Sequence, residues 1–188
     1  MPALRLDHLI VFLPEPAPGH IPGLVLDPGT RHIGQGTRNR RILFPDSYIE
    51  LLWIDVPADA LASGLGFAER CAGGGCPFGV VLRGRLPDRT GFVEYTVPDG
   101  PALLVRDDPA APFLAVNETD DLDTLRPDRR LGPEWINRGT AIERAEIACP
   151  VPPDIVVPGV SFGPGEPRLT VTLAGRDEPV SFRPAGPG

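Results

Sequence analysis

The chain has 188 residues, of which 41% are hydrophobic, and its formal net charge is −7. This length fits a single domain with its own core, and no apolar run approaches the roughly 20 residues of a membrane span. The acidic balance argues against a nucleic-acid partner, because binding to a phosphate backbone needs clustered positive charge. The N-terminus lacks the basic lead-in of a secretory signal, and the three cysteines form no even disulfide framework. We therefore expect a soluble cytoplasmic protein that contacts neither nucleic acid nor membrane.

The 25 prolines and 22 glycines separate short apolar runs, which predicts many short strands joined by tight turns. In the first third of the chain we expect a strand at 4–13, a proline-rich segment at 14–22 and a short strand at 23–26. A glycine- and arginine-rich loop at 27–39 and a hairpin at 40–56 follow. Residues 57–71 are the best helix candidate, although Gly64 and Gly66 weaken it. Further strands are predicted at 78–84, 91–97, 102–105, 112–116 and 141–148, then an exposed loop at 117–135 and a closing hairpin of 168–173 with 179–182.

The order of one strand, a turn or helix, and three more strands occurs at the start and recurs. We therefore expect one domain over residues 1–188, with a first module at 1–56, a second at 57–118 and a degenerate C-terminal extension at 119–188. The expected fold class is α+β, with a mostly antiparallel sheet and few short helices.

His8 and Glu50 are the strongest candidate site residues. Each occupies an alternating strand position whose neighbours on the same face are apolar or aromatic. A buried polar group needs a partner, and three interpretations stay open: a hydrogen-bonded pair that satisfies two buried groups, a metal site, or a metal-free acid/base pair. An imidazole with a carboxylate suits Zn²⁺, Mn²⁺, Fe²⁺ or Ni²⁺.

The loop at 31–39 is the second candidate feature. Its glycines permit close backbone approach, and arginine binds carboxylates and phosphates through two parallel hydrogen bonds. The loop either recognises an anion or polar ligand or is a structured turn with solvated arginines. Candidate ligand-binding residues here and on the predicted strands are Arg31, His32, Gln35, Arg38, Asn39, Trp53, Arg83 and Glu94.

Three segments carry a family resemblance: LDHLIV at 6–11, RHIGQGTRN at 31–39 and YIELL at 48–52. In this order and spacing the chain resembles the glyoxalase-like domain family of the vicinal oxygen chelate superfamily. The resemblance implies paired βαβββ modules that curl around a cavity, where superfamily members hold a divalent metal and act as lyases, isomerases or dioxygenases. Other members have lost the metal and bind or sequester ligands, and sheet edges that pair make a homodimer plausible.

The resemblance makes His8 and Glu50 the expected metal ligands and catalytic residues, with the remaining ligands supplied by the second module. The corresponding strands of this chain contain no ligand, and Asn117 and Glu118 lie just beyond them. The expected metal site is therefore incomplete, since three protein ligands is the usual minimum. The function predicted is a small-molecule-pocket protein, either a lyase, isomerase or dioxygenase acting on a small oxygenated substrate or a metal-free ligand-binding protein. A purely structural or partner-binding protein is the third alternative.

Overall fold

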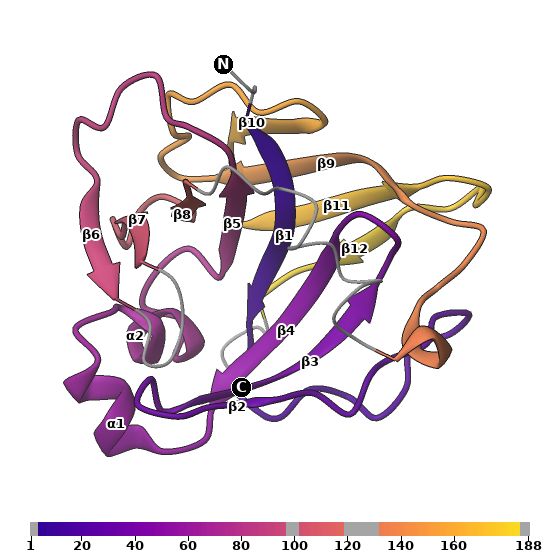
Figure 1. Cartoon of the computed structure of the whole chain (residues 1–188), viewed down its shortest axis with the longest axis horizontal. Coiled ribbons are helices and arrows are strands. Elements are labelled where there is room, and N and C mark those ends of the chain that lie inside the picture. The colour runs from indigo at the N-terminus through magenta and orange to yellow at the C-terminus, as the bar shows by residue number, and fades with distance from the viewer. Residues whose placement is uncertain (1–3, 97–101, 119–131, 185–188) are drawn as a thin grey trace.

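Two β-sheets make up most of the computed structural model, which describes residues 4–96, 102–118 and 132–184. The larger sheet has eight strands in the order β2-β3-β4-β1-β5-β8-β7-β6 and curls into a half-barrel (Figure 1). Its strands are β1 Arg5–Phe12, β2 Arg31–His32, β3 Thr37–Leu43, β4 Tyr48–Ile54, β5 Phe78–Arg83, β6 Val93–Thr96, β7 Ala102–Arg106 and β8 Phe113–Asn117. Most strand pairs are antiparallel, and the fold is of the α+β kind.

The eight strands fall into two halves with the same order. In each half the first strand pairs with the last in parallel: β1 with β4, and β5 with β8. The halves join where β1 pairs with β5 in antiparallel fashion. Helices α1 (Pro57–Ala62) and α2 (Phe67–Cys71) lie between β4 and β5, whereas the described residues between β1 and β2 contain no helix. Within the described residues, no helix is long and apolar enough to cross a membrane.

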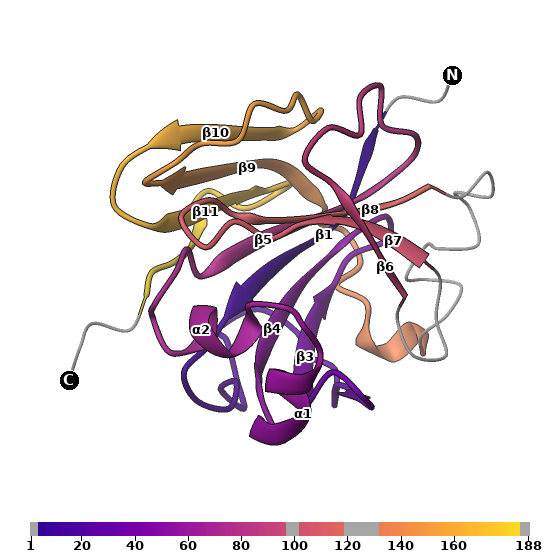
Figure 2. The same cartoon turned by 90° about the vertical axis from the view of Figure 1, so that its left-hand side faces the viewer.

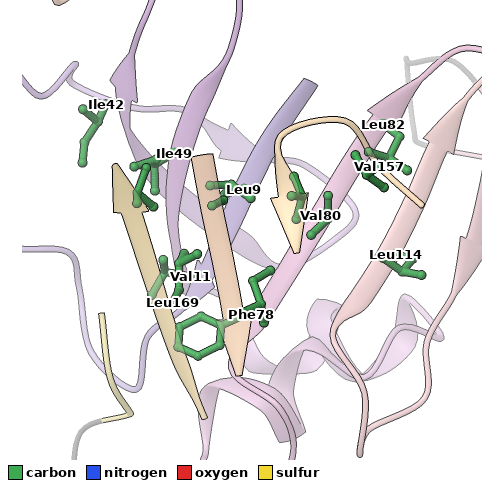
Figure 3. Close-up of a cluster of buried hydrophobic side chains, with 14 of the residues drawn as sticks. Leu9, Val11, Ile42, Ile49, Phe78, Val80, Leu82, Leu114, Val157 and Leu169 are labelled. Atoms are coloured by element: carbon green, nitrogen blue, oxygen red, sulfur yellow. The ribbon is translucent and has the colours of Figure 1, made fainter. Parts of the chain in front are cut away.

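The second sheet covers one face of the first. It has four strands in the order β10-β9-β11-β12, namely β10 Val160–Pro164, β9 Ile142–Cys149, β11 Arg168–Leu173 and β12 Val180–Phe182. Leu9 and Val11 of β1 pack in one buried cluster with Ile147 and Leu169 of the second sheet. Figure 3 shows this cluster between the two sheets.

The two helices lie on the opposite face, which makes three layers (Figure 2). Phe67 of α2 packs against Phe12 and Phe113, with ring centroids 5.1 Å away in each case. Because side chains alternate along a strand, β1 sends Leu9 and Val11 to the second sheet and Ile10 and Phe12 to the helices. His8 falls on the helix side.

Arg70 fixes α2 to the rest of the molecule. Its guanidinium is buried and pairs with Asp107 at 2.7 Å. It also donates to the carbonyl oxygens of Cys76, Asp108 and Ala111 at 2.7–2.9 Å. Removing Asp107 would be strongly destabilising, because it would leave the buried Arg70 guanidinium without its compensating charge. Arg70 therefore holds the helix layer in place over the half-barrel.

Several predicted elements differ from the observed ones. The helix predicted at 57–71 is interrupted at 63–66, where Gly64 has a φ of +75°. The strand predicted at 23–26 is wrong, since the structure has only an isolated bridge between Ile21 and Leu24. β10 was not predicted, because its sequence contains Gly163 and Pro164. Of the predicted loop at 117–135, residues 119–131 lie outside the described residues, and Pro133–Trp135 form a short 3-10 helix.

Gly36 positions the loop at 31–39 against α1. Its φ is +68°, and its carbonyl oxygen accepts from the amides of Asp55 and Val56 at 2.9 and 3.0 Å. A Cβ added at Gly36 would lie 2.2 Å from the backbone nitrogen of Ala60. Only glycine fits this contact, which seats the loop at the start of the helix and lets β3 begin directly after it.

We predict that Gly36→Ala lowers the free energy of unfolding by more than about 3 kcal/mol, in the range of severe single substitutions. Gly64→Ala is the matched control, because Gly64 also has a positive φ but nothing lies within 4 Å of its added Cβ. The control should lose only about 1–2 kcal/mol, the cost of the left-handed backbone. Urea unfolding of both variants measures the difference, and equal losses would contradict the packing argument.

Candidate functional site

A cavity of about 170 Å³ lies on the helix side of the half-barrel, between strands of both halves. Its walls are apolar and come from Ile10, Leu52, Leu65, Phe67, Val81, Leu103, Val105, Phe113 and Ala115. Its polar lining residues are His8, His32, Gln35, Tyr48, Glu50 and Tyr95. An apolar cavity with a few convergent polar groups is the usual form of a small-molecule site.

The pairing of β1 with β4 brings His8 and Glu50 together. The two strands run parallel, with His8 beside Tyr48 and Ile10 beside Glu50 in the register. His8 Nε2 lies 3.4 Å from Glu50 Oε2, and both side chains are buried. The Tyr48 ring stacks on the imidazole, with centroids 4.2 Å apart and planes inclined by 13°. The geometry shows the convergence of His8 and Glu50 that the family resemblance implies.

Asp7 holds the other side of the His8 ring. Its Oδ1 lies 2.6 Å from His8 Nδ1, and its Oδ2 lies 3.4 Å from Arg83 Nε. Neighbouring residues on a regular strand point to opposite faces, so sequence alternation places Asp7 away from His8. The register between β1 and β5 shifts between Leu6 and His8. Such a bulge re-aims a side chain, which explains why alternation alone misses Asp7.

Two more side chains reach the Glu50 carboxylate. His32 Nε2 lies 3.6 Å from Glu50 Oε1, and the Asn39 amide donates to the same oxygen at 2.5 Å. The other imidazole nitrogen of His32, Nδ1, lies 2.9 Å from the Thr37 hydroxyl. Glu50 is therefore a carboxylate between two imidazoles, supported from behind by an amide.

Burial and neighbours shift the pKa values of this pair in opposite directions. Burial disfavours the charged His8 ring, but its contacts with Asp7 and Glu50 outweigh that cost and raise its pKa to about 9. Burial likewise disfavours ionised Glu50, yet its contacts with His8, His32 and Asn39 lower its pKa to about 2. At neutral pH the site holds a buried imidazolium between two carboxylates.

These residues do not fit a metal centre. His8 directs Nδ1 to Asp7 and Nε2 to Glu50, so both ring nitrogens already face a carboxylate. The second half of the sheet contributes Val81, Tyr95, Leu103, Val105, Phe113 and Ala115 to the cavity, and none of these is a His, Cys, Asp or Glu. Among the described residues, no group of three His, Cys, Asp or Glu side chains could hold a metal ion. The donor set is that of a hydrogen-bonded ion pair.

The remaining candidate residues are dispersed. Gln35 and His32 line the cavity, and Asn39 lies behind Glu50. Arg83 lies behind Asp7, and its Nη2 donates to the carbonyl oxygens of Leu6 and Asp46. Arg31 is exposed and pairs with Asp55, and Glu94 is exposed on β6. Arg38 and Trp53 line a different cavity. Asp7 and Tyr48 are site residues that the sequence did not single out as such.

Comparison with known proteins matches the part of the chain that forms most of the half-barrel. Residues 6–97 match the family model described as a glyoxalase-like domain. This part of the chain belongs to the glyoxalase-like domain family, a branch of the vicinal oxygen chelate superfamily. No curated protein matches the chain. A solved structure described as a hypothetical protein from Staphylococcus aureus matches with a TM-score of 0.47 and 17% identity, over 78% of this chain and 70% of that one.

The ion pair predicts a pH dependence of stability. The raised pKa of His8 stabilises the fold fully below the ordinary value of 6.5, and this contribution is lost as pH rises toward about 9. The lowered pKa of Glu50 stabilises the fold above the ordinary 4.5, and this is lost as pH falls toward about 2. His8→Gln should therefore cost most stability between pH 4.5 and 6.5, and clearly less above pH 9.

Urea unfolding of the wild type and His8→Gln across this pH range measures the difference. The matched control is His20→Gln, because His20 is exposed in the proline-rich segment. The control should follow the wild type at every pH. A cost of His8→Gln that stays constant from acid to alkaline pH would contradict the ion pair.

Metal chelation gives a second prediction for this site. Dialysis against EDTA should change the melting temperature by less than about 1 °C, since the described residues offer no group of three metal-ligating side chains. Added Zn²⁺, Mn²⁺ or Ni²⁺ should shift the wild type no more than His8→Gln. A metal-dependent rise in melting temperature that the wild type shows and His8→Gln and His32→Gln lack would contradict this assignment.

Proposed function

We propose that the chain is a small-molecule-binding protein of the glyoxalase-like family that takes an uncharged, oxygen-bearing ligand of about one ring. One observation carries the proposal: an apolar cavity ends at a preformed cluster of polar side chains. Binding in such a pocket draws on burial of the ligand's carbon atoms, whereas the polar end sets its orientation.

The volume of the cavity limits the ligand. A cavity of about 150 Å³ lined by Leu, Ile and Phe is large enough to bind benzene. The cavity here, of about 170 Å³, has the same kind of walls and therefore suits one ring with a small substituent. Phe67 and Phe113 lie in its wall and offer ring edges and faces to an aromatic or unsaturated ligand.

The charges around the cavity favour a neutral ligand. No arginine is among its lining residues, and Glu50 already has cationic His8 as its partner. The Gln35 side chain is part of the lining and makes no hydrogen bond with any described residue, and its amide atoms are not among the fully buried polar atoms. The amide is therefore accessible to pair with a carbonyl or hydroxyl group on the ligand.

Proton-transfer catalysis, as a lyase or isomerase, is the second candidate, because Glu50 lies between two imidazoles. The pKa values weigh against it in the free protein. An efficient general base has a pKa near the working pH, whereas the pKa of Glu50 is lowered to about 2. His8, with its pKa raised to about 9, is protonated, and both of its ring nitrogens already face carboxylates. We therefore prefer ligand binding to catalysis as the proposed function.

We predict that acetophenone binds more tightly than ethylbenzene, which has the same shape without the oxygen, and that both outcompete anionic benzoate in this cavity. Gln35→Leu keeps the volume and removes the amide, so it should abolish the preference for acetophenone, a loss of about tenfold. Glu94→Gln on exposed β6 is the control and should bind like the wild type. Calorimetric titration gives the affinities, and the lack of saturable binding of either compound would overturn the proposal.

The catalytic alternative has its own readout. Acetophenone incubated in D₂O reports abstraction of its methyl protons by NMR, whether or not a product forms. A binding protein should exchange these protons no faster than buffer does. Exchange that is accelerated by the wild type and lost in Glu50→Gln would instead assign proton transfer to this site.

A further inference from the structure

A second cavity, of about 200 Å³, lies between the proline-rich segment before β2 and the surface of β3 and β4. It is lined by Pro16, Ala17, Gly19, Pro28, Arg38, Arg40 and Trp53. None of these residues lines the His8–Glu50 cavity. The two cavities are therefore separate sites.

Strand alternation places the second cavity on the other face of the half-barrel. In the β3–β4 register Arg38 is opposite Trp53, and Asn39 is opposite Leu52. Asn39 contacts Glu50, and Leu52 lines the first cavity. Their neighbours along the strands, Arg38, Arg40 and Trp53, therefore point to the other face. Arg38 and Arg40, two positions apart, share that second face, and their Cα atoms are about 6–7 Å apart along the strand.

Arg38 and Arg40 differ from the structural arginines of this chain. Arg31, Arg41 and Arg70 each pair with a carboxylate. Arg38, in contrast, makes no ion pair or hydrogen bond with any described residue. The guanidinium of Arg40 makes a single long hydrogen bond, of 3.4 Å, to the carbonyl oxygen of Pro18. No Asp or Glu lines the cavity, so it is a cationic site in a chain whose net charge is −7.

Trp53 supplies a third donor. The residue is only 8% exposed, and its indole N–H donates to no described residue. This N–H is not among the fully buried polar atoms of the described residues, so it is accessible to a ligand. Trp53 and the two arginines therefore present donors without acceptors to one cavity, beside the apolar surface of Pro16 and Pro28.

We propose that this cavity binds an organic oxyanion, a carboxylate or phosphate ester on a small apolar group. The two guanidinium groups hold the oxyanion from two sides, since arginine forms paired hydrogen bonds with such groups. The indole N–H donates to a remaining oxygen, and the proline side chains contact the carbon part of the ligand. The site works independently of the His8–Glu50 cavity.

A structural role for the same residues is the competing explanation. In that explanation the methylene groups of Arg38 and Arg40 would cover the indole, as long side chains on a sheet commonly do without binding anything. The two explanations differ in whether binding depends on the charge of the ligand. A covering role needs only the apolar stems, whereas an oxyanion site needs the guanidinium groups themselves.

The test uses the full chain carrying Trp135→Phe, which leaves Trp53 as the single tryptophan, and follows its fluorescence during titration. The probes are inorganic phosphate, phenyl phosphate and benzoate, with benzyl alcohol as the neutral comparator. We expect saturable binding of phenyl phosphate or benzoate, weaker binding of inorganic phosphate and none of benzyl alcohol. Whichever of phenyl phosphate and benzoate binds more tightly identifies the oxyanion.

Arg38→Gln and Arg40→Gln should each weaken that binding about tenfold, the loss expected for a charge-assisted hydrogen bond. Arg31→Gln removes a neighbouring exposed arginine, and Glu50→Gln alters the first cavity, so both should bind like the parent. If Arg38→Gln unfolds, Arg38→Lys keeps the charge without the paired donors and should bind at an intermediate level. Lack of saturation, or an equal loss in Arg31→Gln, would overturn the proposal.

Discussion

The contact on which the site depends is the buried line of charges Asp7–His8–Glu50. One imidazolium lies between two carboxylates, at 2.6 and 3.4 Å, inside a pocket with mostly apolar walls. None of these charges would be stable alone at such depth, because burial strongly disfavours an unpaired ion. The fold supplies the partners: parallel pairing of β1 with β4 brings Glu50, the bulge in β1 brings Asp7, and Arg83 balances Asp7 from behind.

Strand alternation separates the two proposed binding sites of the half-barrel. The face toward α2 is apolar with a compensated ion pair, which is why we propose a neutral ligand there. The opposite face is occupied by the second sheet along most of β1 and β5, but at β3 and β4 it carries Arg38, Arg40 and Trp53 beneath the proline-rich segment. The arginine-rich loop of the sequence is therefore divided: His32 and Gln35 serve the first cavity, whereas Arg38 belongs to the second.

The sequence predicted the parts of the site that follow from strand periodicity. Strand alternation showed that His8 and Glu50 each share a strand face with apolar residues, and the family resemblance implied that the two side chains meet. Asp7 could not be predicted, because a bulge is set by pairing with β5, whose register no local pattern reveals. Three of the four strands of the second sheet were predicted, and β10 was missed because it contains a glycine and a proline. The assignment of the loop residues to two different cavities could not be predicted either, because it depends on the register of β3 with β4.

The central claim is that His8 is an imidazolium at neutral pH, held by Asp7 and Glu50. Nuclear magnetic resonance of protein labelled with ¹⁵N-histidine measures this directly, because chemical shifts distinguish a doubly protonated ring from either neutral tautomer. The account predicts that both His8 nitrogens carry protons at pH 7.5 (about one unit above an ordinary histidine pKa) and that the ring titrates near pH 9. A neutral His8 ring at that pH, with a single protonated nitrogen, would contradict the account.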